Sequence, residues 1–117
     1  MPGIKIISFS YRYTNPPADA VVYDCRKLAN PHYDNRLKKL DGRDPLVQQF
    51  IASRDHPPRL AHILYRARQS AEGGATVAFG CVGGRHRSVA VAEMLAKILR
   101  DVVGNSVQIE HRALQDH

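Results

Sequence analysis

Residues 80–88 combine glycines, cationic side chains and a hydroxyl in the order Gly-Cys-Val-Gly-Gly-Arg-His-Arg-Ser. Glycines, which are free of side-chain steric limits, let a tight turn point its backbone N–H groups at an anion. The preceding residues are typical of a buried strand and the following ones of an amphipathic helix, whose positive end would face the same anion. The sequence therefore predicts a phosphate-binding loop with these contacts: Cys81, Val82, Gly83, Gly84, Arg85, His86, Arg87 and Ser88.

The same segment also has the spacing of a cysteine-dependent phosphatase. Cys81 is followed by five residues and then by Arg87 and Ser88, which would place a thiolate and an arginine around one phosphate. The positive helix end and the neighbouring cations would favour the thiolate. Asp44 of the Asp-Pro pair is a candidate general acid, and capping of the next helix is its alternative role. We predict a binding domain rather than an enzyme, with this phosphatase as the alternative.

Two common nucleotide-binding patterns are absent from the sequence. It contains neither the Gly-Lys-Ser/Thr end of a Walker A loop nor the G-x-G-x-x-G of dinucleotide-binding folds. The two cysteines, Cys25 and Cys81, form no close pair typical of a zinc site or of a disulfide framework. We therefore expect no independent ATP hydrolysis, no metal and no cofactor.

The composition indicates a soluble globular protein with a preference for acidic partners. Seventeen Lys and Arg against eleven Asp and Glu leave a formal charge of +6, which favours phosphorylated metabolites, nucleotides or RNA. A charge of this size also occurs on ordinary soluble domains, so its placement matters more than its total. No stretch has the pattern of a signal peptide or the length of a membrane span. We expect a cytoplasmic protein without a membrane partner.

The hydrophobic periodicity predicts one α/β domain over residues 1–117. Branched apolar runs predict strands at 4–9, 20–25 and 76–79, with a half-exposed edge strand at 106–111. Apolar residues at three- and four-residue spacing predict helices at 46–54, 60–71 and 87–103. The expected architecture is three-layer, with a mostly parallel sheet flanked by helices and a strand-loop-helix phosphate site. Residues 28–44 are expected to form a long irregular connection.

Four segments of the chain carry a resemblance to a known family: 8–13 (Ser-Phe-Ser-Tyr-Arg-Tyr), 24–33 (Asp-Cys-Arg-Lys-Leu-Ala-Asn-Pro-His-Tyr), 40–45 (Leu-Asp-Gly-Arg-Asp-Pro) and 80–89. With them the chain resembles the RapZ C-terminal domain of the RNase adapter family over nearly its whole length. The family's N-terminal Walker A half is missing from this chain, so we expect a stand-alone domain, without the ATPase or kinase activity of that half.

The resemblance implies a function and a wider site. It implies binding of an aminosugar phosphate such as glucosamine 6-phosphate, coupled to binding of a regulatory RNA, with assembly into a homo-oligomer and a separate protein partner as further expectations. Four residues would complete the phosphosugar pocket opposite the loop: Asp24, Arg26, Asn30 and His32. For His32 a backbone-satisfied surface histidine is the alternative. A third interpretation is an interaction domain with a vestigial pocket.

The candidate RNA contacts are Tyr11, Arg12, Tyr13 and Arg112. The first three mix aromatic and basic character suited to base stacking, and their alternative role is to anchor a partly buried loop. The tail 113–117 lacks the basic run expected of an RNA-binding end, which argues against this role.

Overall fold

The computed structural model describes residues 3–104 and 106–114, and the predicted tail lies partly outside this range. Its strands are β1 (Ile4–Ser10), β2 (Val21–Asp24), β3 (Val77–Cys81) and β4 (Val107–His111). They form one four-stranded sheet in the order β2-β3-β1-β4, and every neighbouring pair is parallel. The helices are α1 (Pro45–Ser53), α2 (Arg59–Glu72) and α3 (Arg87–Ile98). A 3₁₀ turn, η1, spans Pro31–Tyr33, and a π-helical turn, η2, spans Leu99–Val103.

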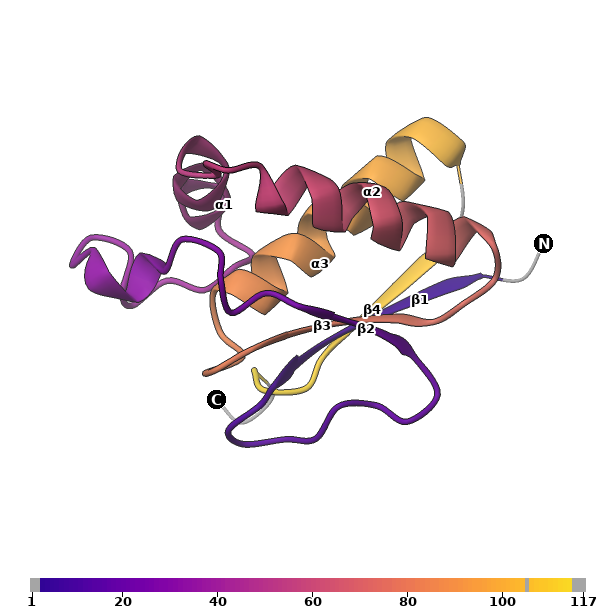
Figure 1. The fold of residues 1–117 in the computed structure, drawn as a ribbon, viewed down its shortest axis with the longest axis horizontal. Helices are drawn as coiled ribbons and strands as arrows, with labels where there is room; N and C mark the ends of the chain where they lie inside the picture. Colours follow the sequence, from indigo (N-terminus) through magenta and orange to yellow (C-terminus); the bar gives the residue numbers. More distant parts are fainter. Residues whose placement is uncertain (1–2, 105, 115–117) are drawn as a thin grey trace.

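The helices α1, α2 and α3 lie together on one face of the sheet (Figure 1). Their apolar residues join the side chains of Ile6, Val77 and Phe79 in one core. The loop 11–20 crosses the opposite face, where a smaller cluster holds Ile7 and Phe9. The predicted α/β fold with a parallel sheet flanked by helices is confirmed, and the layer opposite the helices is a loop.

The burial of each strand follows its place in the sheet. The central strands β1 and β3 are covered on both faces, which explains their nearly continuous apolar sequence. The edge strands β2 and β4 keep half-exposed and exposed positions. The half-exposed edge strand predicted at 106–111 is thus confirmed.

The helix ends follow their sequence signals. Asp44 caps α1 by accepting a hydrogen bond from the Leu46 N–H at 2.9 Å, and Pro45 is the first helical residue, as predicted. The predicted helix 87–103 runs as α3 to Ile98 and then widens into η2, which ends at Gly104 with a φ of 72°. Among the described residues, no helix is long and apolar enough to cross a membrane.

Candidate functional site

A pocket of about 480 Å³ lies at the carboxyl ends of β1 and β3. Parallel sheets collect ligand-binding loops at this edge, and the volume is in the usual range for small-molecule sites. The loop 82–86, which joins β3 to α3, forms one wall of the pocket. The opposite wall comes from loops after β1 and β2. The residues that line it are Arg12, Tyr13, Asn30, His32, Tyr33, Cys81, Val82, Gly83, Arg85, His86 and Arg87.

The backbone of the loop is the first feature suited to an anion. Among the described residues, no protein group accepts a hydrogen bond from the N–H groups of residues 82–87. Gly84 makes the turn with a φ of 70°, and its missing side chain leaves room for Ala113 and Ser10, whose Cβ atoms would lie 2.6 and 2.8 Å from an added Cβ. The turn therefore leaves a run of donors without partners at the positive start of α3.

Arg87 holds the base of the pocket. Its residue exposure is 8%, yet it lines the pocket, and Nη1 donates a hydrogen bond to the Arg26 carbonyl oxygen at 2.6 Å. This bond fixes the guanidinium and leaves its other N–H groups for a ligand. Beneath it, Cys81 Sγ lies 3.2 Å from Ser88 Oγ and 3.4 Å from the Ser88 N–H. Ser88 is fully buried, so it supports the loop from below.

Arg85 turns away from the loop toward residues 28–44. Its guanidinium donates to the carbonyl oxygens of Lys39 at 2.7 Å and Leu40 at 3.3 Å, while its own carbonyl accepts from the Gly42 N–H. A side chain at Gly42 would collide with the His86 carbonyl and the Ala90 N–H, so this connection lies directly against the start of α3. Arg85 thus links the phosphate loop to the long connection.

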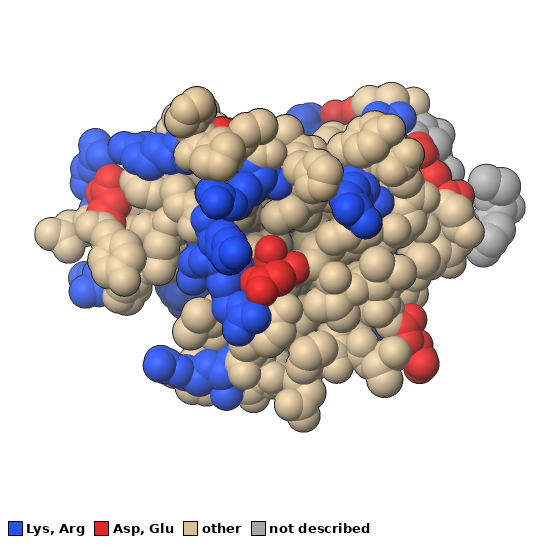
Figure 2. Space-filling view, in the orientation of Figure 1, with Lys and Arg blue, Asp and Glu red and all other residues tan. Residues whose placement is uncertain are grey.

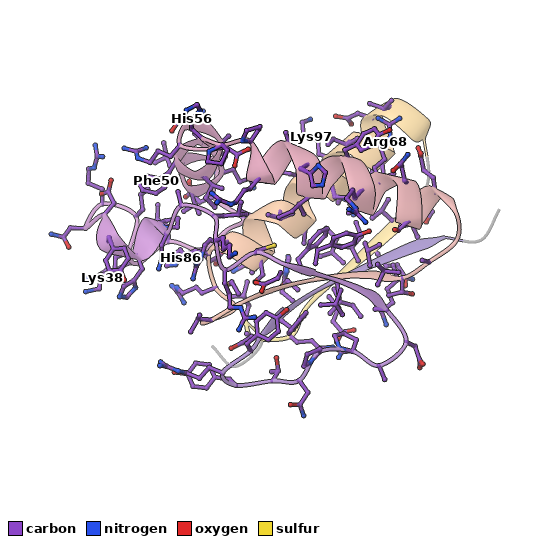
Figure 3. The ribbon with its side chains drawn as sticks, in the orientation of Figure 1. Lys38, Phe50, His56, Arg68, His86 and Lys97 are labelled. Atoms are coloured by element: carbon purple, nitrogen blue, oxygen red, sulfur yellow. The ribbon has the colours of Figure 1, made fainter. Side chains whose placement is uncertain are left out.

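His86 is buried between the start of α3 and the connection that carries Lys38 (Figure 3). Its Nε2 has no hydrogen-bond partner among the described residues. Burial is the main cause that lowers the pKa of His86, and the charges of Arg85 and His32 lower it further. Burial therefore favours the neutral form of the ring.

The outer rim of the pocket is polar and aromatic. Asn30 Oδ1 accepts from the His32 N–H at 3.1 Å, which starts η1 and leaves the amide nitrogen of Asn30 for a ligand. Tyr13 and Tyr33 are 70% and 84% exposed at the two sides. Tyr33 was absent from the residues predicted from the sequence, and only its position next to His32 pointed to it. No Asp or Glu of the described part of the chain is among the lining residues.

Asp24 and Arg26 satisfy each other beside this pocket. Arg26 donates to both carboxylate oxygens of Asp24, at 2.8 to 3.1 Å, and these bonds lower the pKa of the carboxyl. The Arg26 guanidinium also stacks 3.9 Å from the Tyr11 ring centroid. Neither residue lines the pocket, and Asp24 faces a second groove between β2 and α2. Of the predicted ligand contacts, Asn30 and His32 line the pocket. Six residues of the predicted loop line it with them: Cys81, Val82, Gly83, Arg85, His86 and Arg87.

The candidate RNA contacts lie in different surroundings. Arg12 and Tyr13 line the pocket, whereas Tyr11 lies under Arg26. Arg112 donates to Glu110 at 2.7 Å on β4 and is absent from the lining of the pocket and of the second groove. Figure 2 shows Lys and Arg side chains gathered in a strip across one half of the face, around a small acidic patch.

Nothing in the geometry around Cys81 supports phosphatase chemistry. Cys81 is 2% exposed, and its sulfur is engaged with Ser88. Asp44, the candidate general acid, is occupied as the cap of α1. The thiol spacing is present, but the predicted general acid is absent from the described lining of the pocket.

The fold and the loop define a class of protein: an α/β domain with a glycine-rich strand-loop-helix turn at the carboxyl edge of a parallel sheet. The family model of the RapZ C-terminal domain matches residues 2–115, and the chain belongs to this family. The predicted resemblance is confirmed.

The curated relatives are longer proteins. A nucleotide-binding protein of Paramagnetospirillum magneticum is 43% identical over 97% of this chain and 40% of its own length. Nucleotide-binding proteins of Ruegeria pomeroyi and Thermus thermophilus are each 39% identical, over 98% and 96% of this chain and 43% of their own lengths. The chain thus spans about two fifths of the length of the relatives it matches.

Proposed function

We propose that this domain binds a phosphorylated small molecule, with the phosphate on the loop 82–87. One observation carries the proposal: the N–H groups of residues 82–87 have no partner among the described residues. Donors left unpaired in a partly buried site are costly unless a ligand or water satisfies them. Arg87 and the positive helix end supply the charge that distinguishes a phosphate from water.

An aminosugar phosphate such as glucosamine 6-phosphate fits the remaining chemistry. The pocket is larger than a phosphate needs, and the amide of Asn30 and the ring of His32 offer groups for sugar hydroxyls. Tyr13 and Tyr33 provide exposed aromatic surface against the less polar side of a sugar ring. The relatives' description as nucleotide-binding makes a nucleotide the natural competitor in the test.

Calorimetric titration of the purified protein with glucosamine 6-phosphate, glucosamine, inorganic phosphate and AMP tests the proposal. We expect the phosphosugar to bind most tightly and glucosamine not at all. Arg87→Ala should weaken phosphosugar binding by roughly 30-fold or more, about 2 kcal/mol, because a buried charged hydrogen bond is lost.

The matched control is Arg59→Ala, which removes an exposed arginine at the start of α2, away from the pocket lining. It should leave affinity within twofold. Equal affinity of wild type and Arg87→Ala, or no binding of any phosphorylated ligand, would refute the proposal. Tighter binding of AMP than of the sugar phosphate would assign the pocket to nucleotides.

RNA binding is a second candidate function, favoured by the strip of Lys and Arg side chains in Figure 2 and by Arg12, Arg85 and Arg87 in the lining of the pocket. Phosphate contacts by such residues make affinity fall steeply as salt rises. We expect retention of RNA at low salt, with a salt slope that becomes shallower in Arg12→Ala. Absence of retention at low salt would exclude this role.

A further inference from the structure

The two cysteines of the chain lie side by side on neighbouring parallel strands. The register pairs Tyr23 with Phe79 and Asp24 with Gly80, so Cys25 and Cys81 are the next pair. The hydrogen bond from the Cys25 N–H to the Gly80 carbonyl, at 2.8 Å, continues the ladder to this point. The sequence did not reveal that the two cysteines are neighbours, because helices α1 and α2 lie between the two strands along the chain.

Both thiols belong to the same face of the sheet. The rings of Tyr23 and Phe79 pack at 5.8 Å on the helix-covered face, and side chains two residues further along each strand return to that face. Cys25 and Cys81 are accordingly both members of the main core, at 0% and 2% exposure.

The strand spacing matches the reach of a disulfide. Parallel neighbours lie about 4.8 Å apart, inside the roughly 4.4 to 6.8 Å between Cα atoms that a disulfide bridges. The Cβ atoms of a cystine lie nearer, at about 3.8 Å, so the two chains must move together slightly. That movement is available because β2 has ended at Asp24. Disulfides under strain are the ones that are readily reduced again.

The two thiols differ in their access to solvent. Cys81 is only 2% exposed but is among the residues that line the pocket, so a small oxidant in the pocket lies nearer to Cys81 than to Cys25, which is fully buried and absent from that lining. Cys25 is enclosed, and burial, followed by the neighbouring Cys81, raises the pKa of its thiol. Access to the pocket therefore makes Cys81 the thiol that attacks the oxidant, and Cys25 the thiol that then resolves the sulfenic acid.

We propose that Cys25 and Cys81 form a peroxide-oxidisable dithiol that closes to a reversible intramolecular disulfide. The sulfur of Cys81 attacks one peroxide oxygen, the O–O bond breaks, and a sulfenic acid and one water result. The sulfur of Cys25 then attacks the sulfur of Cys81. The S–S bond forms, the S–O bond breaks, and the hydroxyl leaves as a second water with the proton of Cys25. The thiols lose two electrons to the peroxide.

Closure of this disulfide alters the phosphate loop. Cys81 Sγ now accepts from the Ser88 N–H and contacts Ser88 Oγ, and both contacts hold the first turn of α3. Drawing Cys81 toward Cys25 weakens them and shifts the loop that begins at Val82. This second step rests on the proposed function, and it predicts phosphate affinity at least fivefold weaker in the oxidised protein.

Reduced full-length protein treated with hydrogen peroxide and then alkylated provides the test. Intact mass should show loss of two hydrogens without alkylation, and peptide mapping should join the peptides of Cys25 and Cys81. Dithiothreitol should restore two alkylatable thiols. In Cys25→Val, or in Cys25→Ala if the valine protein does not fold, dimedone should label Cys81 as a sulfenic acid and no cross-link should appear.

Two thiols still open to alkylation after peroxide treatment would overturn the proposal. Cross-links only between molecules, or sulfinic acid at Cys81 of wild type, would overturn it as well. The coupling is measured by titrating inorganic phosphate into reduced and oxidised wild type, with reduced Cys25→Val expected within twofold of reduced wild type. If reduced protein binds no phosphate, the proposed function fails while the cross-link result stands separately. Equal affinity of both forms would refute the coupling.

Discussion

The starts of α1 and α3 solve the same problem in opposite ways. Every helix begins with backbone N–H groups that the helix itself does not satisfy. At α1 the carboxylate of Asp44 accepts from the Leu46 N–H, and at α2 Asp55 accepts from the N–H groups of Leu60 and Ala61. At α3 the residue in the cap position is His86, which makes no such bond.

The difference between these helix starts indicates where a ligand could bind. An aspartate carried by the chain closes α1 and α2, so their positive ends are neutralised from within. Among the described residues, no Asp or Glu lines the pocket at the start of α3, and the N–H groups of residues 82–87 have no partner there. An external anion would occupy at α3 the position that an aspartate side chain occupies at the other helices.

Placing a carboxylate at the open helix start should have the largest effect. A Cβ added at Gly83 would meet no atom within 4 Å, and the φ of this residue lies outside the left-handed region, so the position accommodates a side chain. We expect Gly83→Asp to weaken phosphate binding by about 100-fold, near 3 kcal/mol, through like-charge repulsion and occupation of the N–H groups. Isothermal titration measures this.

The controls for that change are Gly83→Asn, which has a similar shape without charge, and Gly83→Ala. Both should bind phosphate more tightly than Gly83→Asp, and the affinity of Gly83→Ala should be nearest to that of wild type. An aspartate variant that binds phosphate as well as the asparagine variant would contradict the idea that this helix start is kept open for an anion.

Gly84→Ala tests whether the shape of the turn keeps α3 open. The φ of 70° and the nearby Cβ atoms of Ala113 and Ser10 oppose any side chain. We expect a loss of about 2 kcal/mol in the free energy of unfolding, against about zero for Gly83→Ala in the same urea titration. Equal stability of the two alanine variants would show that the turn does not depend on its left-handed glycine.

Asp44→Ala opens a helix start that is now closed. Loss of the cap should reduce the free energy of unfolding by about 1 kcal/mol, and Asp44→Ser should recover most of it. Phosphate affinity of both variants should stay within twofold of wild type, because α1 is not part of the pocket. A tenfold loss of affinity in Asp44→Ala would mean that the two helix starts are not independent.

The smallest effect concerns His86 and pH. Its folded-state pKa is lowered below the unfolded value, so the unfolded chain binds the proton more readily. Stability is fully present above the unfolded pKa of about 6.5 and is lost as pH falls toward the folded pKa. His86→Leu should flatten the decline in unfolding free energy below pH 6.5, as measured by urea unfolding at several pH values. An unchanged slope would show that His86 does not contribute to it.

Much of the fold could be predicted from the sequence because its signals are local. Apolar runs and periodicity placed every strand and the three α-helices, and Asp44 with Pro45 marked the start of α1. The glycines and cations of residues 80–88 located the pocket. The covering of one sheet face by a loop was not foreseen, since periodicity does not tell which face a helix covers.

The details of the site depend on which donors the protein itself uses, and residue types do not reveal this. Arg85, predicted as a ligand contact, lines the pocket and also donates to the carbonyls of Lys39 and Leu40, which its residue type did not reveal. Arg26 and Asp24 have the donors and acceptors that a phosphosugar needs, but in this structure they form hydrogen bonds with each other. These outcomes depend on distances set by the tertiary fold.

The hydrogen bonds from Arg85 to the carbonyls of Lys39 and Leu40 would make ligand binding in the pocket detectable in residues 28–44. Because the same loop would hold the phosphate, a bound ligand that restrains the loop would also restrain residues 28–44 through these hydrogen bonds. Trypsin cleaves after lysine and arginine, and its cleavage within residues 28–44 would slow in proportion to the fraction of protein with ligand bound. Protection of residues 28–44 from cleavage would then report the concentration of the ligand.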